Sequence, residues 1–184
     1  MALPLTPLHH PVAYFLYRLD KRLSLPGLIV GCMFPDLEIP FMLLFFGSQG
    51  PNRMVLHSLL GAATLGTFLA VVVTVRIYPY VVSRLFHVDK ERVERKCRLS
   101  FALVLSVLIG ILSHVLLDVT NHPSNPIFWP FHPTTASPIY FALGEPLGYL
   151  WIQIAMGVLL AALIFVKRKN VFEELLVGSN KLML

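Results

Sequence analysis

Residues 99–123, LSFALVLSVLIGILSHVLLDVTNHP, join a membrane-length apolar run to a short series of polar residues. Segment 99–117 contains only His114 as a residue that can carry charge, and about 20 apolar residues span the hydrocarbon of a bilayer. The run therefore predicts a transmembrane helix. His114 and Asp118 are one helical turn apart and project from one face, with His122 near the helix end. The pair either holds a metal ion or forms a hydrogen-bonded polar pocket.

The composition of the whole chain indicates an integral membrane protein. Of its 184 residues, 56% are hydrophobic and 14% are charged, and the mean hydropathy of +0.71 is well above that of soluble domains. No polar linker or internal repeat divides the sequence, so residues 1–184 are predicted to form a single domain. Cys32 and Cys97 lie in dissimilar segments and predict neither a disulfide nor a thiolate metal site.

Five membrane segments are predicted to form an all-α, polytopic helical bundle. Segments 54–75, 99–117 and 149–166 are apolar and long enough to cross the bilayer. Two weaker segments precede them: segment 4–17 is short, and segment 23–46 is broken by prolines. Broken backbone at membrane depth occurs mainly where protein covers it or where it lines a wet cavity, so the broken segment is a candidate for function.

The basic residues predict how these segments are oriented. With five alternating crossings, fourteen of the fifteen lysines and arginines fall on one side, and Arg53 falls on the other. The positive-inside rule makes the basic side cytoplasmic, including the loop 84–98 and the C-terminus. The Pro-rich loop 119–148 would then lie outside the inner, or plasma, membrane. Topology thus explains the net charge of +5, and no nucleic-acid partner is expected.

The same topology gathers ionisable residues at the outer ends of the segments. Within a bilayer such groups cost about 2.5–3.5 kcal/mol each, which makes them functional candidates. They are His9, His10, Asp36, Glu38, His57, His114, Asp118, His122, His132 and Glu145. The predicted metal ligands are Asp36, His57, His114, Asp118 and, in preference to His10, His9. Imidazole and carboxylate ligands suit zinc first, then manganese or iron.

Each predicted ligand also has a simpler explanation. His57 can place its ring in the lipid headgroup layer, and Asp36 can cap a helix after a proline turn. His114 and Asp118 can pair with each other. These separate explanations do not predict a common depth and side, so a shared metal site is favoured. The set can hold one ion or two, and two ions would clamp a phosphoester between them.

Further residues are predicted to act around the metal. Glu38 and His122 are the candidates for proton transfer. Glu38 and Glu145 are also candidates for supporting a metal ligand through a hydrogen bond, and the simpler explanation for both is a solvated or capping role. Arg53, the single outer cation, would meet a phosphate of the substrate or a lipid headgroup. Trp129 and His132 lie in the Pro-rich loop, where they either bind substrate or rest at the membrane surface.

Several short motifs resemble those of a known family. TPLHHP, LPGLIVGCMFPDLEIPF, LHSLLG and LIGILSHVLLDVTNHP, followed by WPF, occur in this order over residues 5–133. They resemble the prokaryotic membrane-bound metal-dependent hydrolases, whose histidine and aspartate pattern is similar to that of zinc-dependent phospholipase C and P1-type nucleases. The resemblance implies that the metal ligands are Asp36, His57, His114 and Asp118, with His9 as the family's early histidine. Some relatives carry a second aspartate beside Asp36 and a threonine before His57, which this sequence lacks. A trinuclear site of the phospholipase type would also need late ligands, for which His122, His132 and Glu145 are only candidates, so one or two ions are favoured over three.

The predicted function is hydrolysis of a phosphoester, in a lipid headgroup or a lipid-linked molecule, at the extracytoplasmic face. The main alternative is a membrane transporter or ion-binding protein that uses the same residues, and the next is a metal that only staples the helices. Membrane lipid is the expected partner. Gly157 and Ala161, at small-xxx-small spacing, predict close helix packing within the bundle or in a homo-oligomer.

Overall fold

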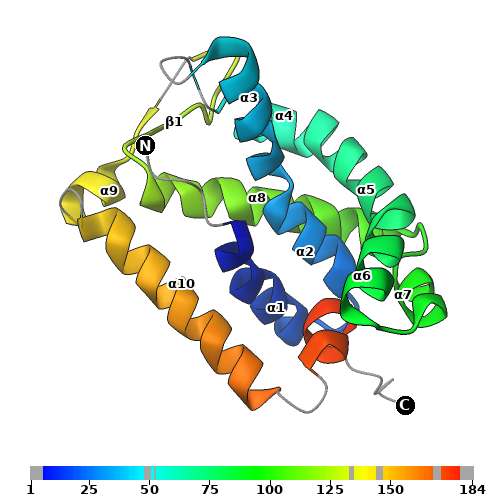
Figure 1. Cartoon of the computed structure of the whole chain (residues 1–184). Coiled ribbons are helices and arrows are strands. Elements are labelled where there is room, and N and C mark those ends of the chain that lie inside the picture. The colour runs from blue at the N-terminus through cyan, green and yellow to red at the C-terminus, as the bar shows by residue number, and fades with distance from the viewer. Residues whose placement is uncertain are drawn as a thin grey trace.

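The computed structural model describes residues 6–47, 51, 53–132, 135–143, 147–167 and 171–178. Helices dominate these residues, which confirms the predicted all-α fold (Figure 1). In chain order they are η1 (Thr6–His9), α1 (His10–Leu19), α2 (Leu25–Met33), η2 (Pro35–Leu37), α3 (Glu38–Phe46), α4 (Leu59–Gly61), η3 (Ala62–Gly66), α5 (Thr67–Arg76), α6 (Tyr78–Phe86), α7 (Lys90–Lys96), α8 (Phe101–Asn121), α9 (Pro138–Leu143), α10 (Leu147–Val166) and η4 (Glu173–Val177). One antiparallel pair of two-residue strands, β1 (Ser124–Asn125) and β2 (Thr135–Ala136), follows α8.

Serine side chains define where three long apolar helical segments begin. Ser24, Ser58 and Ser100 precede α2, α4 and α8, and each hydroxyl oxygen accepts a hydrogen bond from the backbone N–H three residues later. A helix leaves its first N–H groups without partners, and inside a membrane such groups are costly. The serine caps therefore fix the start of each helix at a defined residue.

Three helical segments are long and apolar enough to cross a membrane: Leu25–Phe46, Leu59–Arg76 and Phe101–Thr120. The first comprises α2, η2 and α3, so the predicted break lies within a segment of spanning length. The apolar part of α10, Leu150–Val166, is shorter. Helix α1 has ten residues and is about 15 Å long, half the hydrocarbon thickness, so it does not cross by itself.

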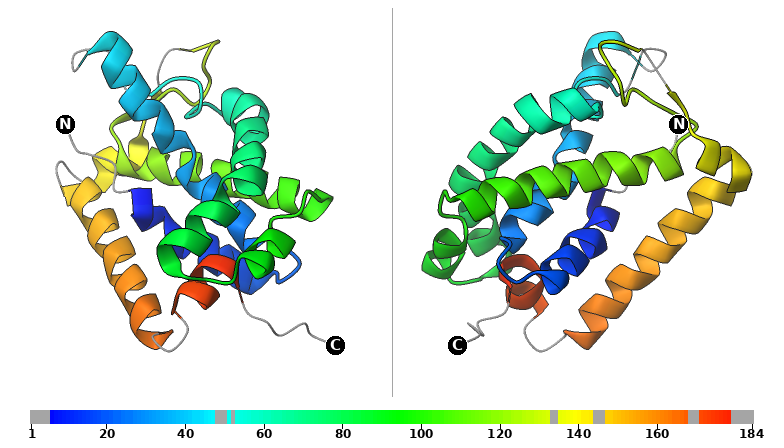
Figure 2. Two further views of the ribbon diagram at one scale, coloured as in Figure 1. Left: turned by 45° about the vertical axis from the view of Figure 1, so that its right-hand side comes forward. Right: turned by 180° about the vertical axis from the view of Figure 1, so that it is seen from behind.

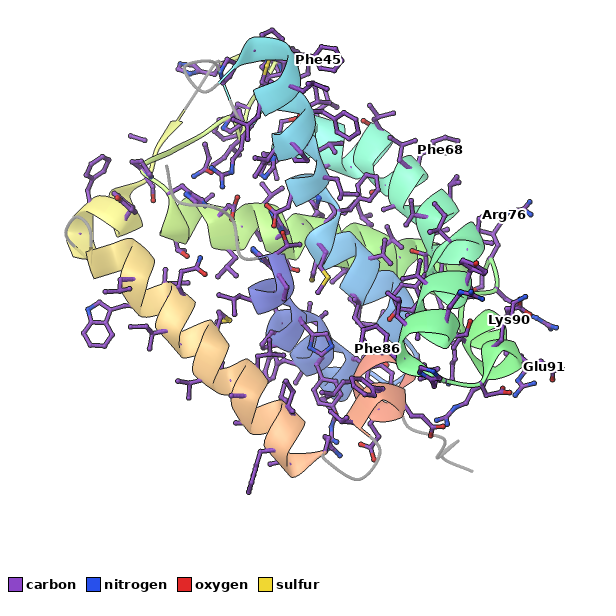
Figure 3. The ribbon with its side chains drawn as sticks, in the orientation of Figure 1. Phe45, Phe68, Arg76, Phe86, Lys90 and Glu91 are labelled. Atoms are coloured by element: carbon purple, nitrogen blue, oxygen red, sulfur yellow. The ribbon has the colours of Figure 1, made fainter. Side chains whose placement is uncertain are left out.

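Large apolar side chains cover the outside of the bundle. Phe45, Phe68 and Phe165 are 75%, 65% and 71% exposed, and they lie on α3, α5 and α10. Phe45 and Phe68 project away from the ribbon in Figure 3. A water-facing surface of this kind would favour aggregation, whereas lipid tails solvate it. The exposed aromatic surface therefore fits a lipid-embedded bundle.

Helices α2 and α8 cross in close contact near the middle of the molecule (Figures 1 and 2). Gly31 and Gly110 form the crossing point. A Cβ atom on Gly31 would lie 2.4 Å from the Val107 carbonyl oxygen, and one on Gly110 would lie 2.6 Å from the Leu28 carbonyl oxygen. Both distances are too short for non-bonded atoms, so glycine at each position permits the approach.

Several helix ends assemble into one basic end of the bundle. The Tyr78 hydroxyl donates to the Leu176 carbonyl oxygen at 2.8 Å, which joins α6 to η4. Arg92 on α7 forms an ion pair with Glu173 at 2.5 Å. Figure 3 places Arg76 and Lys90 in this region, beside α6 and α7. Segment 84–98, predicted as a basic loop, thus contains the end of α6 and all of α7.

The Pro-rich segment 119–148 is tied to the opposite end of α8. Ser124 pairs with Ala136 in the strand pair, and α9 follows directly. The backbone N–H of Leu59 donates to the carbonyl oxygen of Ile127 at 2.9 Å, which fastens this segment to the start of α4. Glu145 lies outside the described residues.

Candidate metal centre

Four ionisable side chains from three parts of the chain meet at one buried point. Asp36 lies on η2 between α2 and α3, and His57 directly precedes the cap of α4. His114 and Asp118 lie one turn apart on α8. The exposed fractions of these residues are 6%, 1%, 0% and 3%, in the order given. The structure therefore brings together all four principal ligands predicted from the sequence.

The separations among these groups match neighbouring ligands of a metal ion. His57 Nε2 lies 3.8 Å from Asp36 Oδ1 and 3.6 Å from Asp118 Oδ2. His114 Nε2 lies 3.6 Å and 3.7 Å from the same two oxygens. A charged hydrogen bond would measure about 2.7–2.9 Å. Four of the six separations among these atoms are 3.6–3.8 Å. A tetrahedral zinc ion with bonds of about 2.0–2.2 Å holds neighbouring nitrogen and oxygen ligands about 3.3–3.6 Å apart, close to these four values.

The outer nitrogen of each imidazole has its own partner. His114 Nδ1 lies 2.7 Å from the carbonyl oxygen of Cys32, which can only accept, so Nδ1 carries the proton and donates. His57 Nδ1 lies 2.9 Å from Glu38 Oε2, to which it likewise donates. Both Nε2 atoms then present a lone pair toward the two aspartates. Metal-bound histidines are oriented by such bonds from the far side of the ring.

Glu38 also organises the chain that leads to His57. Its carboxylate accepts backbone N–H bonds from Met54, Val55 and Leu56 at 2.7–3.2 Å, in addition to the bond from His57. These bonds engage both carboxylate oxygens. The geometry favours a positioning role for Glu38 over the proton-transfer role predicted from the sequence.

Charge and hydrogen bonding both point to a missing cation. The carboxylates of Asp36, Glu38 and Asp118 are buried around one buried guanidinium, that of Arg53. With neutral imidazoles, these groups leave a net charge of −2. Among the described residues, Asp36 Oδ2, Asp118 Oδ2 and both Nε2 atoms lack a hydrogen-bond partner. Buried groups of this kind are costly unless they are paired or bind metal, and a divalent cation would satisfy both requirements.

A proton on His57 is the competing explanation. Burial acts to lower the pKa of His57, but Asp36 and Glu38 outweigh it and hold the pKa above its usual value. A proton on Nε2, however, would draw a carboxylate oxygen to hydrogen-bonding distance, whereas Nε2 lies 3.6 Å from Asp118 Oδ2 and 3.8 Å from Asp36 Oδ1. The long separations favour a metal over a proton.

Arg53 and His122 flank the cluster beside Asp118. Arg53 Nε lies 3.3 Å from Asp118 Oδ2, and Arg53 Nη2 donates to His122 Nε2 at 2.9 Å. Burial lowers the pKa of His122 to about 4; Asp118 opposes this shift and Arg53 reinforces it. At neutral pH His122 is therefore an uncharged imidazole that accepts from Arg53. Both predicted neighbours of the metal lie at the cluster.

The two adjacent N-terminal histidines point in different directions. The His9 ring stacks on that of His114 with centroids 4.1 Å apart, and its nitrogen can join His114 and Asp118 around a common ion. His10 instead contacts the Leu175 carbonyl oxygen at 2.7 Å. His9 thus faces the cluster, as preferred from the sequence. The potential ligands form two groups, one of His9, His114 and Asp118 and one of Asp36, His57 and His114. His114 belongs to both groups and has only Nε2 available for a metal, because Nδ1 is hydrogen-bonded to Cys32. Since one nitrogen lone pair binds one ion, this favours one ion over two.

The Pro-rich segment contains two further predicted substrate-binding residues, Trp129 and His132. His132 is exposed and is in neither group of potential metal ligands among the described residues. Trp129 is partly buried, between Phe128 and Phe131, which are 55% and 84% exposed. Their role in binding a substrate stays a prediction.

Two stabilising contacts could not be found from sequence motifs. The acceptor for His114 is a main-chain oxygen, that of Cys32, and any residue type provides one. The Asn125 side-chain amide donates to the backbone oxygen of Asp118 at 3.1 Å, which steadies the end of α8. The only sequence signal for the Asn125 contact is that Asn125 follows shortly after His114 and Asp118.

Comparison with known proteins places this cluster in a membrane protein family. The profile of the YdjM inner membrane protein family matches residues 7–178. The chain belongs to this family. No curated protein and no solved structure matches it. Membership of the YdjM family agrees with the apolar helices and supports a location in the inner membrane.

The family match covers every residue of the cluster, from His9 to His122. The match supports the part of the resemblance that concerns a family of membrane proteins. It does not extend to a hydrolase or to the P1-type nucleases. A capacity to hold a metal therefore rests on the geometry of the YdjM-family cluster itself.

Proposed function

We propose that this protein is a metal-dependent hydrolase that acts on a phosphoester of a lipid headgroup or lipid-linked molecule. The observation that carries the proposal is the inward-facing set of four buried ligand atoms, separated by 3.6–3.8 Å and without mutual hydrogen bonds. A bound divalent metal, zinc first and manganese or iron next, would supply Lewis acidity toward a phosphoryl oxygen and a water.

The residues around the ligands suit an anionic substrate. Arg53 is the cation of this region, and its planar guanidinium can bind two phosphate oxygens while remaining beside Asp118. His122 is neutral and its Nε2 accepts from Arg53 Nη2; when Arg53 turns this group to a phosphate, the Nε2 lone pair becomes free, and His122 is the proposed proton acceptor in that state. Glu38 holds His57 in place through Nδ1. These roles divide the predicted site into metal ligands, one anion-binding residue and one proton acceptor.

The depth of the site supports a lipid substrate. His114 lies about 20 Å along α8 from Phe101, at roughly 1.5 Å per residue, so the cluster is in the half of the bundle away from the basic end. If the basic end is cytoplasmic, the cluster lies toward the outer headgroup layer. A phosphoester of a membrane lipid would reach that layer without leaving the bilayer.

A transporter that uses the same residues is the alternative. A transport route requires polar groups on both sides of the ion site. Between the cluster and the basic end, however, the buried core of α8 consists mainly of Leu103, Val107 and Ile111. This apolar core favours a pocket open to one side, and therefore the hydrolase.

Metal analysis followed by turnover measurements tests the proposal. Protein purified without chelator should contain about one equivalent of metal and should hydrolyse bis(p-nitrophenyl) phosphate or phospholipid in vesicles. His114→Ala should lower both metal content and turnover at least tenfold. His87→Asn is the matched control, because His87 is exposed with φ of +55°, a conformation that asparagine tolerates.

Three outcomes separate the candidates. Metal and turnover that are both lost in His114→Ala support the hydrolase. Bound metal without turnover on either substrate contradicts it, and ion flux in liposomes then separates a transporter from a structural metal. If the protein binds none of zinc, manganese and iron when each is supplied at neutral pH, the metal centre is contradicted as well.

A further inference from the structure

A second feature lies away from the metal centre, between α1 and α10. It is an apolar groove of about 670 Å³. Pro11, Tyr14 and Phe15 of α1 form one wall, and Met156, Leu159 and Leu163 of α10 form the other. Helix α10 runs along the side of the bundle, apart from the α2–α8 crossing (Figure 2). The groove therefore opens on the surface that the apolar helices expose to lipid.

Beside this groove, the contact between α10 and η1, the short helix that leads into α1, is loose. A Cβ atom on Gly157 would meet only the Leu8 side chain, at 3.9 Å, among the described residues. Leu159 on the groove wall remains 49% exposed. In a bilayer, a gap of this kind must be filled, because neither water nor vacuum is stable against apolar walls. A hydrocarbon chain is the filler that the surroundings supply.

Two cations stand at the basic end of the groove. Arg18 and Lys167 both line it. Arg18 forms no ion pair with a residue that the structure describes, and Lys167 pairs with Glu174 at 2.6 Å. The bond from Glu174 raises the pKa of Lys167, and the charge of Arg18 opposes that rise, which places both cations at the same opening. The opening thus carries more positive charge than its own acidic groups neutralise.

We propose that this groove binds an acidic phospholipid, with one acyl chain between α1 and α10 and the headgroup phosphate at Arg18 and Lys167. An apolar slot alone would accept any lipid. The uncompensated Arg18 at its end selects a net negative headgroup, since basic pockets between membrane helices attract anionic lipids. The site belongs to the leaflet at the basic end, opposite the metal centre, and does not depend on the proposed hydrolase activity.

Lipid retention tests the proposal. Full-length protein in mild detergent is supplied with phosphatidylglycerol or phosphatidylcholine, and bound lipid is measured by native mass spectrometry. Wild type should retain phosphatidylglycerol in preference to phosphatidylcholine. Arg18→Gln should weaken phosphatidylglycerol retention about fivefold, the value of one interfacial charge. Leu159→Trp, which fills the groove, should lower the retention of both lipids.

Arg84→Gln is the matched control, because Arg84 is an exposed cation of the basic end, on α6, that does not line the groove. Its lipid retention should equal that of wild type, and the melting temperature in detergent should be unchanged in every variant, which verifies folding whether or not the protein binds metal. If Leu159→Trp lowers the melting temperature, Leu163→Phe replaces it. Equal retention of both lipids by wild type, or unchanged retention in Arg18→Gln, would overturn the proposal. Two further results would also overturn the proposal. One is displacement of the bound lipid by free glycerol phosphate, and the other is a dimer cross-linked through α10 with no lipid bound.

Discussion

Two helix pairs in this protein make contact in opposite ways. Helices α2 and α8 touch backbone to backbone, with Gly31 and Gly110 at the crossing. Helix α10 touches Leu8 of η1 loosely at Gly157, and α1 and α10 leave an apolar groove between them. The tight pair carries Asp36, just beyond the end of α2, and His114 on α8. In the loose pair, neither α1 nor the described part of α10 carries a metal ligand; the candidate His9 lies on η1, which precedes α1.

The difference shows what each contact is suited to. Metal coordination tolerates displacements of only a few tenths of an ångström, so ligands on different helices need a crossing that cannot slide. The glycine contact fixes the distance between α2 and α8 and so the distance between Asp36 and His114. A lipid chain is flexible and needs only a slot. The close contact therefore suits the metal centre, and the open contact suits a lipid.

The most severe way to break the tight contact is Gly31→Ala. The added Cβ would lie 2.4 Å from the Val107 carbonyl oxygen, so α2 and α8 must separate. We expect a loss of about 3 kcal/mol in stability, at the upper end of the usual cost of overpacking, together with loss of bound metal. Thermal unfolding in detergent and metal analysis measure the two effects. An unchanged melting temperature would show that the crossing is not tight.

A smaller effect is expected from loosening one ligand without moving a helix. Glu38→Gln removes the carboxylate that holds His57 Nδ1 and leaves the four proposed ligands in place. Metal affinity should fall about 10- to 100-fold, as for other groups that orient a metal-bound histidine. Competition with a chelating dye measures the affinity. Glu91→Gln, at a side chain that is 83% exposed, is the control, and equal affinities in the two variants would contradict the positioning role.

The smallest effect is expected in the loose pair. Gly157→Ala adds a Cβ that meets Leu8 at an ordinary contact distance of 3.9 Å. Alanine also favours a helix over glycine, so the variant should be as stable as wild type or more stable by about 0.5 kcal/mol. The same unfolding measurement applies. A destabilisation comparable to that of Gly31→Ala would erase the distinction between the two helix pairs.

The sequence was enough to predict which ionisable residues form the cluster. His114 and Asp118 lie one turn apart on a helix that is otherwise apolar, and the prolines around Asp36 indicate a broken helix at membrane depth. The apolar segments then place His57 at the same level. Each of these ionisable residues lies in or beside a segment that is predicted to be in the bilayer, where an ionisable group is energetically costly. That cost identifies the residue as a functional candidate.

The packing that supports these ligands was not predictable in the same way. The sequence favoured Gly157 and Ala161 for close helix packing, whereas the close contact is at Gly31 and Gly110. Whether a glycine permits a close approach depends on which helix crosses it, and one sequence does not specify that partner. For the same reason the sequence leaves Glu38 open between proton transfer and support of a ligand, since its bonds to His57 and to the chain before it follow from the fold.

The central claim is that Asp36, His57, His114 and Asp118 coordinate one metal ion. Anomalous diffraction from crystals of protein purified without chelator tests it most directly. We predict a single anomalous peak about 2.0–2.3 Å from Asp36 Oδ1, His57 Nε2, His114 Nε2 and Asp118 Oδ2. The absence of a peak, with the carboxylates instead hydrogen-bonded to the Nε2 atoms at about 2.8 Å, would contradict the account.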